Sequence, residues 1–418
     1  MTAPTPPVND LHIEDVQARL QQHITAITDH ETVGLHCALD RVLAQDVVSP
    51  LSVPPHDNSA MDGYAFDGAC LAPGGTVRLT FVGTALAGKA WSQTVQAHEC
   101  VKIMTGAVMP AGLNTVVPFE LTDVQRDTVQ FEAARLCPGA NRRRLGEDLM
   151  AGQSALRAGQ RLTPAALGLL ASLGLQQLTV FRRIRVAYFS TGDEILSLGE
   201  PPREGAVYDS NRYTLTGLLT RMGTEVIDLG VVPDEPAALR ATFERAAREA
   251  DAIVTSGGIS MGDADHTRAM MAQMGDINFW RIAMRPGRPM AFGQLRAADG
   301  NGAWLFGLPG NPVAAMVTFL VLVRPALLRQ MGCAAPAPVL LRAVCDQAIK
   351  KRPGRSEFLR GTVQPNAQGQ LCVHTTGPQG SGVLSSMVQA NGLIVLGHDQ
   401  GDVAAGDPVD VLMFNGVM

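Results

Sequence analysis

The sequence is most constrained by an alternation of short apolar runs and amphipathic stretches that begins at Arg185. The apolar runs are typical of buried strands, and the amphipathic stretches have helical spacing. The strands are expected at residues 186–189, 225–229 and 252–255, and the helices at residues 215–222, 239–249 and 267–274. This alternation indicates a doubly wound parallel α/β sheet. We therefore expect an α/β domain over residues 183–333, with ligands bound at the carboxyl ends of its strands.

The first part of the chain has a different pattern. Helical spacing at residues 12–29 and 164–173 predicts a discontinuous helical and extended linker domain, formed by residues 10–50 and 146–182. Residues 51–145 lie between the two pieces and contain short β-type runs broken by Gly, Pro and Asp. They predict a small β domain inserted into the linker.

The end of the chain is again mostly β. Helical patterns stop after Pro336, and short strand patterns follow. They predict a small barrel or sandwich over residues 334–418, of which we expect the barrel. The expected fold class is α/β plus β, with several domains in a chain of 418 residues.

Composition narrows the kind of partner. A net charge of −5 disfavours binding to nucleic acid or to an anionic membrane surface, which select basic proteins. The N-terminus lacks the pattern of a secretory signal, and the longest apolar run, residues 313–323, is too short to cross a bilayer. The 7 cysteines are scattered without a C-x-x-C pair, which predicts reduced thiols. We expect a cytoplasmic protein that binds a small molecule.

Three loops at the predicted strand ends carry polar or glycine-rich sequence. Residues 190–194 contain two adjacent carboxylates, and residues 256–265 combine a Gly-Gly pair with two aspartates. Residues 307–312 precede a helix and expose backbone N–H groups. Any one of these loops could be an ordinary turn with capping carboxylates. Together they favour a phosphate-bearing ligand, with Mg²⁺ between the carboxylates and the phosphate.

A basic segment supplies cationic groups in the same domain. Arg281, Arg285 and Arg288 lie within residues 280–289. Guanidinium groups match the geometry of phosphate and other oxyanions, although a solvated basic turn would have the same composition.

One apparent nucleotide-binding motif is rejected. Residues 83–90 nearly match the P-loop pattern, but Ala90 stands where Ser or Thr must hold Mg²⁺, and no helical pattern follows. We interpret this stretch as part of a β-turn segment.

Five motifs occur in order along nearly the whole chain. They are Asp57-Asn58-Ser59-Ala60-Met61-Asp62-Gly63-Tyr64, Ile103-Met104-Thr105-Gly106-Ala107, Ser190-Thr191-Gly192-Asp193-Glu194, Ser256-Gly257-Gly258 and Leu308-Pro309-Gly310-Asn311-Pro312. Together they closely resemble the bacterial MoeA family, which includes the E domain of gephyrin. The resemblance implies a molybdopterin molybdenumtransferase, which uses Mg²⁺ to exchange the AMP of adenylated molybdopterin for molybdenum from molybdate.

The resemblance also implies an architecture. The molecule would be an elongated four-domain homodimer with a MogA/MoaB-like α/β domain and a C-terminal barrel. The α/β domain of one subunit and the inserted β domain of the other would form a shared active site. Further partners could include the molybdopterin adenylyltransferase and other proteins of the cofactor pathway.

Individual roles follow from the resemblance, position by position. The catalytic residues would be Asp62, Thr105, Asp148, Glu194, Asp234 and Asp265. The Mg²⁺ ligands would be Glu194, Asp265 and Asp62. The substrate-binding residues would be Ser190, Thr191, Gly192, Ser256, Gly257, Gly258, Arg281, Arg285, Arg288, Pro309, Gly310, Asn311, Pro312, Arg355 and Ser381.

The chain departs from the family in its basic segment. Lysines are common there in the family, whereas this chain has Arg281, Arg285 and Arg288. Charge is kept, but arginine differs from lysine in reach and geometry, so the contacts with molybdate are open.

Two other functions remain as alternatives. The first is a molybdopterin adenylyltransferase, whose fold resembles the α/β domain alone. The second is a non-catalytic scaffold, because the E domain of gephyrin also clusters receptors. The inserted and C-terminal domains favour the molybdenum step over the first. The presence of Asp62, Glu194 and Asp265 favours an enzyme over the second.

Overall fold

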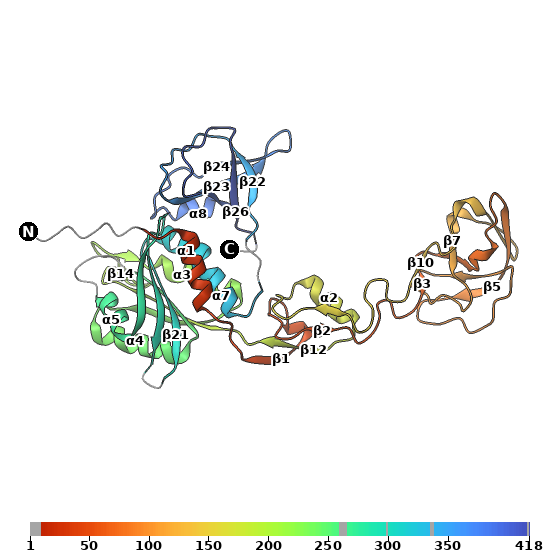
Figure 1. Ribbon diagram of the computed structural model, residues 1–418, viewed down its shortest axis with the longest axis horizontal. Helices are drawn as coiled ribbons and strands as arrows, with labels where there is room; N and C mark the ends of the chain where they lie inside the picture. The colour runs from red at the N-terminus through yellow and green to blue at the C-terminus, as the bar shows by residue number, and fades with distance from the viewer. Residues whose placement is uncertain (1–9, 259–265, 298–299, 335–337, 416–417) are drawn as a thin grey trace, which may run out of the picture.

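The computed structural model describes residues 10–258, 266–297, 300–334, 338–415 and 418. The molecule is elongated, with two lobes joined by a slender arm (Figure 1). One lobe holds the α/β sheet with the C-terminal barrel beside it, and the other holds the inserted β region. The predicted fold class is confirmed, while the limits of the four domains stay a prediction.

The α/β sheet has the strand order β16-β13-β17-β21-β20-β18. The first four strands are parallel, whereas β20 and β18 are antiparallel to their neighbours. The antiparallel edge differs from the fully parallel expectation, because the short links between these strands leave no room for a crossover helix. The strands are β13 (Arg185–Thr191), β16 (Glu225–Val232), β17 (Ala252–Ser256), β18 (Gly275–Arg281), β20 (Pro289–Arg296) and β21 (Gly302–Leu308).

Helices cover both faces of this sheet. Successive residues of β13 point to opposite faces, so Val186 and Tyr188 enter one core while Ala187 and Phe189 enter the other. The second core is covered by α4 (Pro236–Glu249) and α5 (His266–Met274), and the first by α3 (Ser210–Met222) and the helices that follow β21. Asp209 caps α3 at its start, and Gly223, with φ 88°, ends it.

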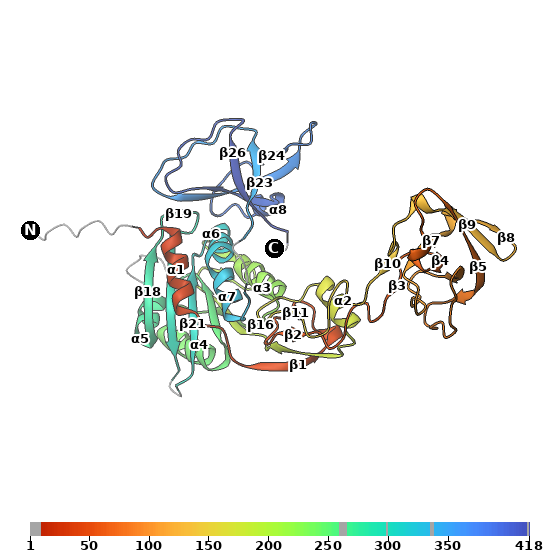
Figure 2. The same ribbon diagram turned by 45° about the vertical axis from the view of Figure 1, so that its right-hand side comes forward.

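The first helix was expected in the linker domain, but it packs against the α/β domain. α1 (Ile13–His23) buries Ile13, Val16 and Leu20 in the first α/β core, and it lies beside α7 (Figure 2). The preceding Leu11 continues this attachment, because Ala283 N–H donates to its carbonyl at 2.8 Å. The sequence predicted the buried face of the helix correctly but assigned it to the wrong neighbour.

A continuous helical stretch crosses the centre of the α/β lobe. It consists of α6 (Pro312–Thr318), a π-helical segment (Phe319–Val323) and α7 (Arg324–Gln330). The whole stretch, Pro312–Gln330, has 19 residues and is long and apolar enough to span a membrane. The prediction that this segment is too short to cross a bilayer, made from residues 313–323 alone, was therefore wrong. However, 72% of its most apolar window is buried inside the protein, as expected of a core helix.

The arm is built from paired extended segments. β1 (His30–Gly34) pairs with β12 (Gln177–Phe181), and β2 (Val47–Val48) pairs with β11 (Ser154–Leu156). α2 (Pro164–Ser172) begins with the Thr163 hydroxyl as N-cap and matches the predicted helix. The two chain segments of the arm run antiparallel. The chain therefore enters and leaves the inserted region through the same arm.

The inserted region has a single mixed sheet of order β7-β4-β6-β5-β9-β8. The rejected P-loop lies largely in β5 and its turn, as the sequence predicted. A short ribbon of β3 (Asn58–Ser59) and β10 (Arg142–Arg143) marks the entry from the arm (Figure 2). The sheet strands are β4 (Gly63–Phe66), β5 (Thr76–Ala85), β6 (Glu99–Ile103), β7 (Thr115–Pro118), β8 (Asp123–Gln125) and β9 (Thr128–Glu132).

The C-terminal strands close into a barrel. The order β23-β24-β22-β26-β25 returns to its start through the pairing of β25 with β23, which confirms the predicted barrel. β19 (Met284–Arg285), a strand of the α/β region, pairs with the start of β23 and joins the barrel to that region. The strands are β22 (Leu341–Cys345), β23 (Ser356–Pro365), β24 (Leu371–Thr375), β25 (Gly392–Leu396) and β26 (Pro408–Met413), with α8 (Ser385–Gln389) beside them.

Candidate functional site

A pocket of about 510 Å³ lies where the α/β region meets the barrel. Three segments far apart in the sequence form it: the arginine segment before β20, the loop before α6, and the barrel. Some of the residues expected to bind substrate come together here. Those that line it are Arg285, Arg288, Pro309, Gly310, Asn311, Arg355 and Ser381.

The three arginines of the basic segment have different environments. Asp10 forms ion pairs with Arg281 at 3.1 Å and with Arg288 at 2.8 Å. Arg285 is exposed, lines the pocket and has no ion pair within the described part of the chain. Arg285 is therefore the member of this segment whose charge is free for a ligand. No sequence pattern pointed to Asp10, which lies about 270 positions away in the chain.

On the barrel side of the pocket, a buried arginine that the sequence analysis did not identify binds the loop before Ser381. Arg360 is fully buried, and its guanidinium donates to the Gly380 carbonyl at 2.9 Å and to the Ser386 hydroxyl at 2.9 Å. Burial, and then the positive charge of Arg285, lower the pKa of Arg360. Ser381 is fixed next to it, because its carbonyl accepts from Val313 N–H at 3.0 Å. The loop before Ser381 is thus bound to the barrel, and Ser381 to the start of α6.

Two predicted serines have buried side chains. The Tyr188 hydroxyl lies 2.7 Å from that of Ser190 and 2.8 Å from that of Ser256, and the two serine hydroxyls are 3.1 Å apart. Burial raises the pKa of Tyr188, so this hydroxyl stays protonated. These side chains satisfy one another and line neither pocket, so they position the strand ends. β-strand alternation could have revealed that Tyr188 and Ser190 share a face, whereas Ser256 comes from the neighbouring strand β17.

A second chain of polar groups runs from the buried hydroxyls of Thr191 and Thr267 to the exposed carboxylate of Asp193. Thr191 lies 3.4 Å from Thr267, hydroxyl to hydroxyl, and Thr267 donates to Asp234 at 3.1 Å. The backbone N–H of Asp234 in turn approaches the carboxylate of Asp193 at 3.4 Å. Predicted residues of three loops are therefore tied together at the carboxyl edge of the sheet.

The predicted glycines allow close approach of the backbone. Gly257 has φ +90°, and a Cβ there would lie 2.3 Å from the Thr191 carbonyl oxygen. At Gly258, φ +63°, a Cβ would lie 2.5 Å from the side chain of Thr267. At Gly192 a Cβ would meet the carboxylate of Glu194 at 2.6 Å. Side chains at these positions would force the loops apart.

The carboxylates predicted to bind Mg²⁺ do not form a cluster within the described residues of one chain. Glu194 is exposed beside Gly192, whereas Asp62 lies in the far lobe (Figure 1). Asp265 falls outside the described residues. Glu194 and Asp193 offer exposed carboxylate oxygens at a strand end, the donor chemistry that Mg²⁺ prefers. These donors fit the ion.

Asp62 and Thr105 contact each other at the exposed surface of the inserted region. The backbone N–H and the hydroxyl of Thr105 both donate to Asp62 Oδ1, at 2.7 and 2.9 Å. The backbone bond first, and then the hydroxyl bond, hold the pKa of Asp62 below its usual range. Asp148 is exposed where the chain leaves this lobe, and its N–H donates to the Val53 carbonyl at 3.0 Å. Asp62 precedes β4 and Thr105 follows β6, both in the inserted lobe, whereas the pocket lies between the α/β region and the barrel in the other lobe.

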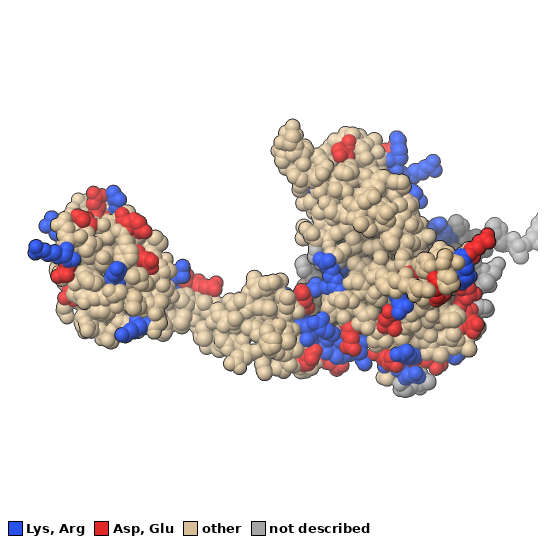
Figure 3. Space-filling model, turned by 180° about the vertical axis from the view of Figure 1, so that it is seen from behind, with Lys and Arg blue, Asp and Glu red and all other residues tan. Residues whose placement is uncertain are grey.

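Charged side chains are spread unevenly over the surface. On the face in Figure 3, Lys, Arg, Asp and Glu are interspersed over the α/β lobe and the inserted region, while much of the arm is uncharged. Exposed apolar side chains lie along the arm and its junction with the insert, among them Leu39, Val48, Leu51 and Met150.

Sequence profiles match three consecutive parts of the chain. "MoeA N-terminal region (domain I and II)" matches residues 11–174, "Probable molybdopterin binding domain" residues 187–329, and "MoeA C-terminal region (domain IV)" residues 342–414. Together with the pocket between the α/β sheet and the barrel, these matches define a multidomain protein of molybdenum cofactor biosynthesis.

Full-length relatives give the family. A molybdopterin molybdenumtransferase of Haemophilus influenzae is 39% identical over 407 residues, which cover 97% of this chain and 99% of that protein. Molybdopterin molybdenumtransferase 2 of Mycobacterium tuberculosis is 38% identical over 389 residues, 91% of this chain and 94% of that protein. The chain therefore belongs to the MoeA family of molybdopterin molybdenumtransferases, and it is a transferase.

A solved structure agrees over the whole length. The molybdopterin biosynthesis moeA protein of Pyrococcus horikoshii OT3 has a TM-score of 0.82 and 27% sequence identity, and the match covers 97% of this chain and all of that one. The fold, including the separated lobes, is therefore shared with a structurally characterised relative.

Proposed function

We propose that this chain inserts molybdenum from molybdate into adenylated molybdopterin with Mg²⁺-dependent release of AMP. The observation that carries the proposal is the pocket in which Arg285, Arg355 and Ser381 converge from separate segments. Guanidinium forks and an adjacent hydroxyl bind a tetrahedral oxyanion such as molybdate. The strand-end loops next to Asn311 would hold the phosphate-bearing end of the pterin substrate.

The residues of the chain position charge around the reacting groups. Arg285 and the free terminal nitrogens of Arg355 would fix the oxyanion, while Glu194, Asp265 and Asp62 would hold Mg²⁺. The ion, when bound, would neutralise the pyrophosphate link that breaks when AMP leaves. Asp62 is suited to this role because its lowered pKa keeps it ionised at neutral pH. Molybdopterin itself supplies the sulfur chemistry, and the protein supplies position and charge.

We also propose that the active enzyme is a homodimer with two shared sites. In one chain, Asp62 belongs to the inserted lobe and Arg285 to the lobe of the α/β sheet. The arm separates these lobes (Figure 1), so a second chain would have to bring the two residues together. The exposed apolar side chains of the arm, such as Val48 and Met150, support contact with another copy. The proposal extends to a cytoplasmic setting, where the substrate would be received from the adenylyltransferase. It also extends to the four domain limits, except that α1 packs with the α/β domain.

The direct test is release of AMP from purified adenylated molybdopterin. Wild type should release AMP only when molybdate and Mg²⁺ are both present, and Asp62→Asn should lose at least about tenfold of this rate. Asp127→Asn is the matched control, an exposed aspartate of the same lobe. Consumption of ATP with free molybdopterin, and no AMP release, would replace the proposal by an adenylyltransferase. Binding of substrate without either reaction would favour a scaffold.

A further inference from the structure

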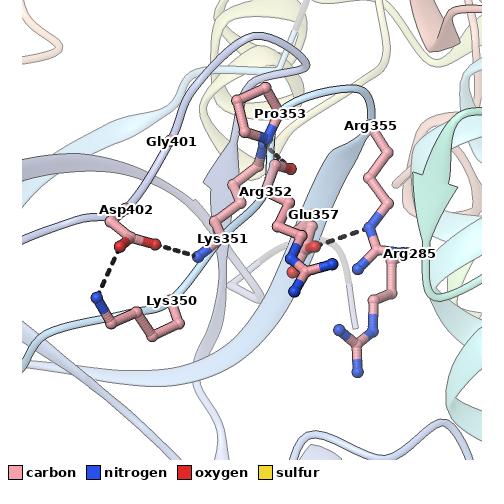
Figure 4. Close-up of a pocket in the computed structure, with 9 residues that line it drawn as sticks. All are labelled: Arg285, Lys350, Lys351, Arg352, Pro353, Arg355, Glu357, Gly401 and Asp402. Carbon is pink, nitrogen blue, oxygen red and sulfur yellow. Dashed lines mark hydrogen bonds and ion pairs between the residues drawn. The ribbon is translucent and has the colours of Figure 1, made fainter.

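A second pocket, of about 690 Å³, lies on the barrel side of the first (Figure 4). Five cationic and two acidic side chains line it, in a chain whose net charge is −5. Lys350, Lys351 and Arg352 come from the segment before β23, and Arg285 and Arg355 are shared with the first pocket. None of the first three is among the residues expected to bind substrate. The first pocket therefore does not account for Lys350, Lys351 and Arg352.

Some of these cations are already occupied. Lys350 pairs with Asp402 at 2.7 Å, and the buried ammonium group of Lys351 donates to the Gln400 carbonyl at 2.7 Å. Arg355 uses its Nε for the buried carboxylate of Glu357 at 2.8 Å. These groups shape the wall of the pocket and neutralise its two acids.

Two guanidinium groups remain without an acidic partner. Neither Arg285 nor Arg352 forms an ion pair with any residue that the structure describes, and both are exposed. In Figure 4 the guanidinium groups of Arg285, Arg352 and Arg355 point toward the same space. Like charges that gather without a counter-charge repel one another, and an anion between them removes the repulsion.

The segment that presents Arg352 is anchored on both sides. Lys351 N–H donates to Asp402 at 2.9 Å, and Gly354 N–H donates to the His398 carbonyl at 2.9 Å. Beyond them, Ser356 N–H donates to the Ala283 carbonyl at 2.8 Å. The backbone around Arg352 is thus fixed before any ligand arrives, which reduces the entropy lost on binding.

We propose that this pocket is a second oxyanion site, in which Arg352, Arg285 and the terminal nitrogens of Arg355 bind a tetrahedral dianion. Guanidinium groups have the geometry for such a ligand, and the lining contains no aromatic side chain that would favour a base or a ring. The ligand is either a free oxyanion or the phosphate end of a phosphomonoester. Because Arg285 and Arg355 line both pockets, an anion in the second site would lie next to the first site.

The test is equilibrium dialysis of the full-length protein with radiolabelled inorganic phosphate at low ionic strength, without pterin substrate. Wild type should bind two phosphate ions per chain. Arg352→Ala should weaken one of the two sites at least about tenfold, and Ser381→Ala should weaken the other. Arg342→Ala is the matched control, an exposed barrel arginine that pairs with Asp410 and lines neither pocket.

The outcomes separate this proposal from the proposed function. One phosphate per chain in wild type, or two in Arg352→Ala with unchanged affinity, would overturn the second site even if AMP release is normal. Two ions with the expected losses would support it even if AMP release fails. Competition by AMP for the ion that depends on Arg352 would assign the site to phosphomonoesters. Lack of competition would assign it to free oxyanions.

Discussion

Thr105 donates two hydrogen bonds, from its backbone N–H and its hydroxyl, to a single carboxylate oxygen of Asp62. Both residues are exposed, so the arrangement buries no side chain. Its effect is on orientation and charge, because both bonds favour the ionised carboxylate over the neutral acid. A fixed anionic group at the exposed surface of the inserted lobe, 43 residues apart in sequence from its partner, is what a shared catalytic site would present to another subunit.

The first prediction concerns this pair. Thr105→Val removes the hydroxyl bond and keeps the backbone bond, so the pKa of Asp62 should rise toward its usual value without reaching it. Asp62 would then become protonated at a higher pH than in wild type. Carbon NMR titration of the carboxyl group in the full chain measures this, with Thr105→Ser as the control that keeps the wild-type pKa. An unchanged pKa in the valine variant would show that the hydroxyl bond does not form in solution.

The second prediction concerns the unpaired arginine of the pocket. Arg285→Ala should lower the rate of AMP release by roughly 10–100-fold, because a hydrogen bond to a charged group contributes about 1.5–3 kcal/mol. Arg285→Lys keeps the charge and should retain more of the rate. The free energy of unfolding should not change, since Arg285 is exposed. Steady-state kinetics of both variants decide the matter, and equal losses would exclude a role for charge.

The third prediction concerns the junction between the arm and the α/β sheet. Arg182 donates to both oxygens of Asp251, at 2.7 and 2.8 Å, and Arg185 N–H donates to the same carboxylate at 2.7 Å. Asp251→Asn should lower the free energy of unfolding by roughly 2–3 kcal/mol at neutral pH, because it weakens a largely buried pair. Asp410→Asn, in an exposed pair with Arg342, should cost less than about 1 kcal/mol.

The pH dependence of this effect has a definite sign. Burial would raise the pKa of Asp251, but the bonds from Arg182 and Arg185 outweigh it, and the pKa lies below its usual value in the folded protein. The stabilisation is therefore present above the pKa of unfolded aspartate and is lost as pH falls through the folded pKa. The free energies of unfolding of wild type and Asp251→Asn, measured by chemical denaturation, should become equal as the pH is lowered. A difference that grows on acidification would contradict the account.

The fourth prediction concerns the glycine pair after β17. Gly257→Ala should lower the free energy of unfolding by more than about 1 kcal/mol, because the residue has φ +90° and its Cβ would lie 2.3 Å from the Thr191 carbonyl oxygen. Gly217→Ala is the matched control on α3, where nothing lies within 4 Å of the added carbon. It should raise stability by roughly 0.5–1 kcal/mol. Thermal unfolding of the two variants should therefore shift in opposite directions.

The sequence predicted the fold where periodicity was strong. Buried parallel strands such as β13 and β17 are short, apolar and followed by helices, so the α/β sheet was visible. The sequence indicates barrel strands at residues 339–345, 371–375, 393–396 and 408–413 but not at β23. Arg360, Gly361 and Thr362 interrupt the apolar pattern of β23, although Arg360 and Gly361 are buried in the barrel. The amphipathic pattern of α1 identified its buried face. Periodicity cannot identify the surface against which a face packs, and α1 was assigned to the wrong neighbour.

The sequence pointed to several residues of the candidate site but not to the contacts between them. The family resemblance named several of the residues that line the first pocket. It placed Asp62 and Thr105 in the inserted domain but did not predict the hydrogen bonds between them. The contacts of Asp10 with Arg281 and Arg288, and of Arg360 with the loop before Ser381, join segments whose proximity no local pattern encodes. The hydroxyls of Ser190 and Ser256 bond to Tyr188 because neighbouring strands bring them into register, which requires the strand order to be known.

The most direct test of the account is complementation between two inactive variants. Asp62→Asn and Arg285→Glu should each abolish AMP release, because each removes one half of both shared sites. Random exchange of subunits makes half of the dimers mixed, and each mixed dimer has one intact site of two, so the mixture should recover about one quarter of the wild-type rate. A mixture no more active than the separate variants, under conditions where subunits exchange, would contradict a site shared between subunits.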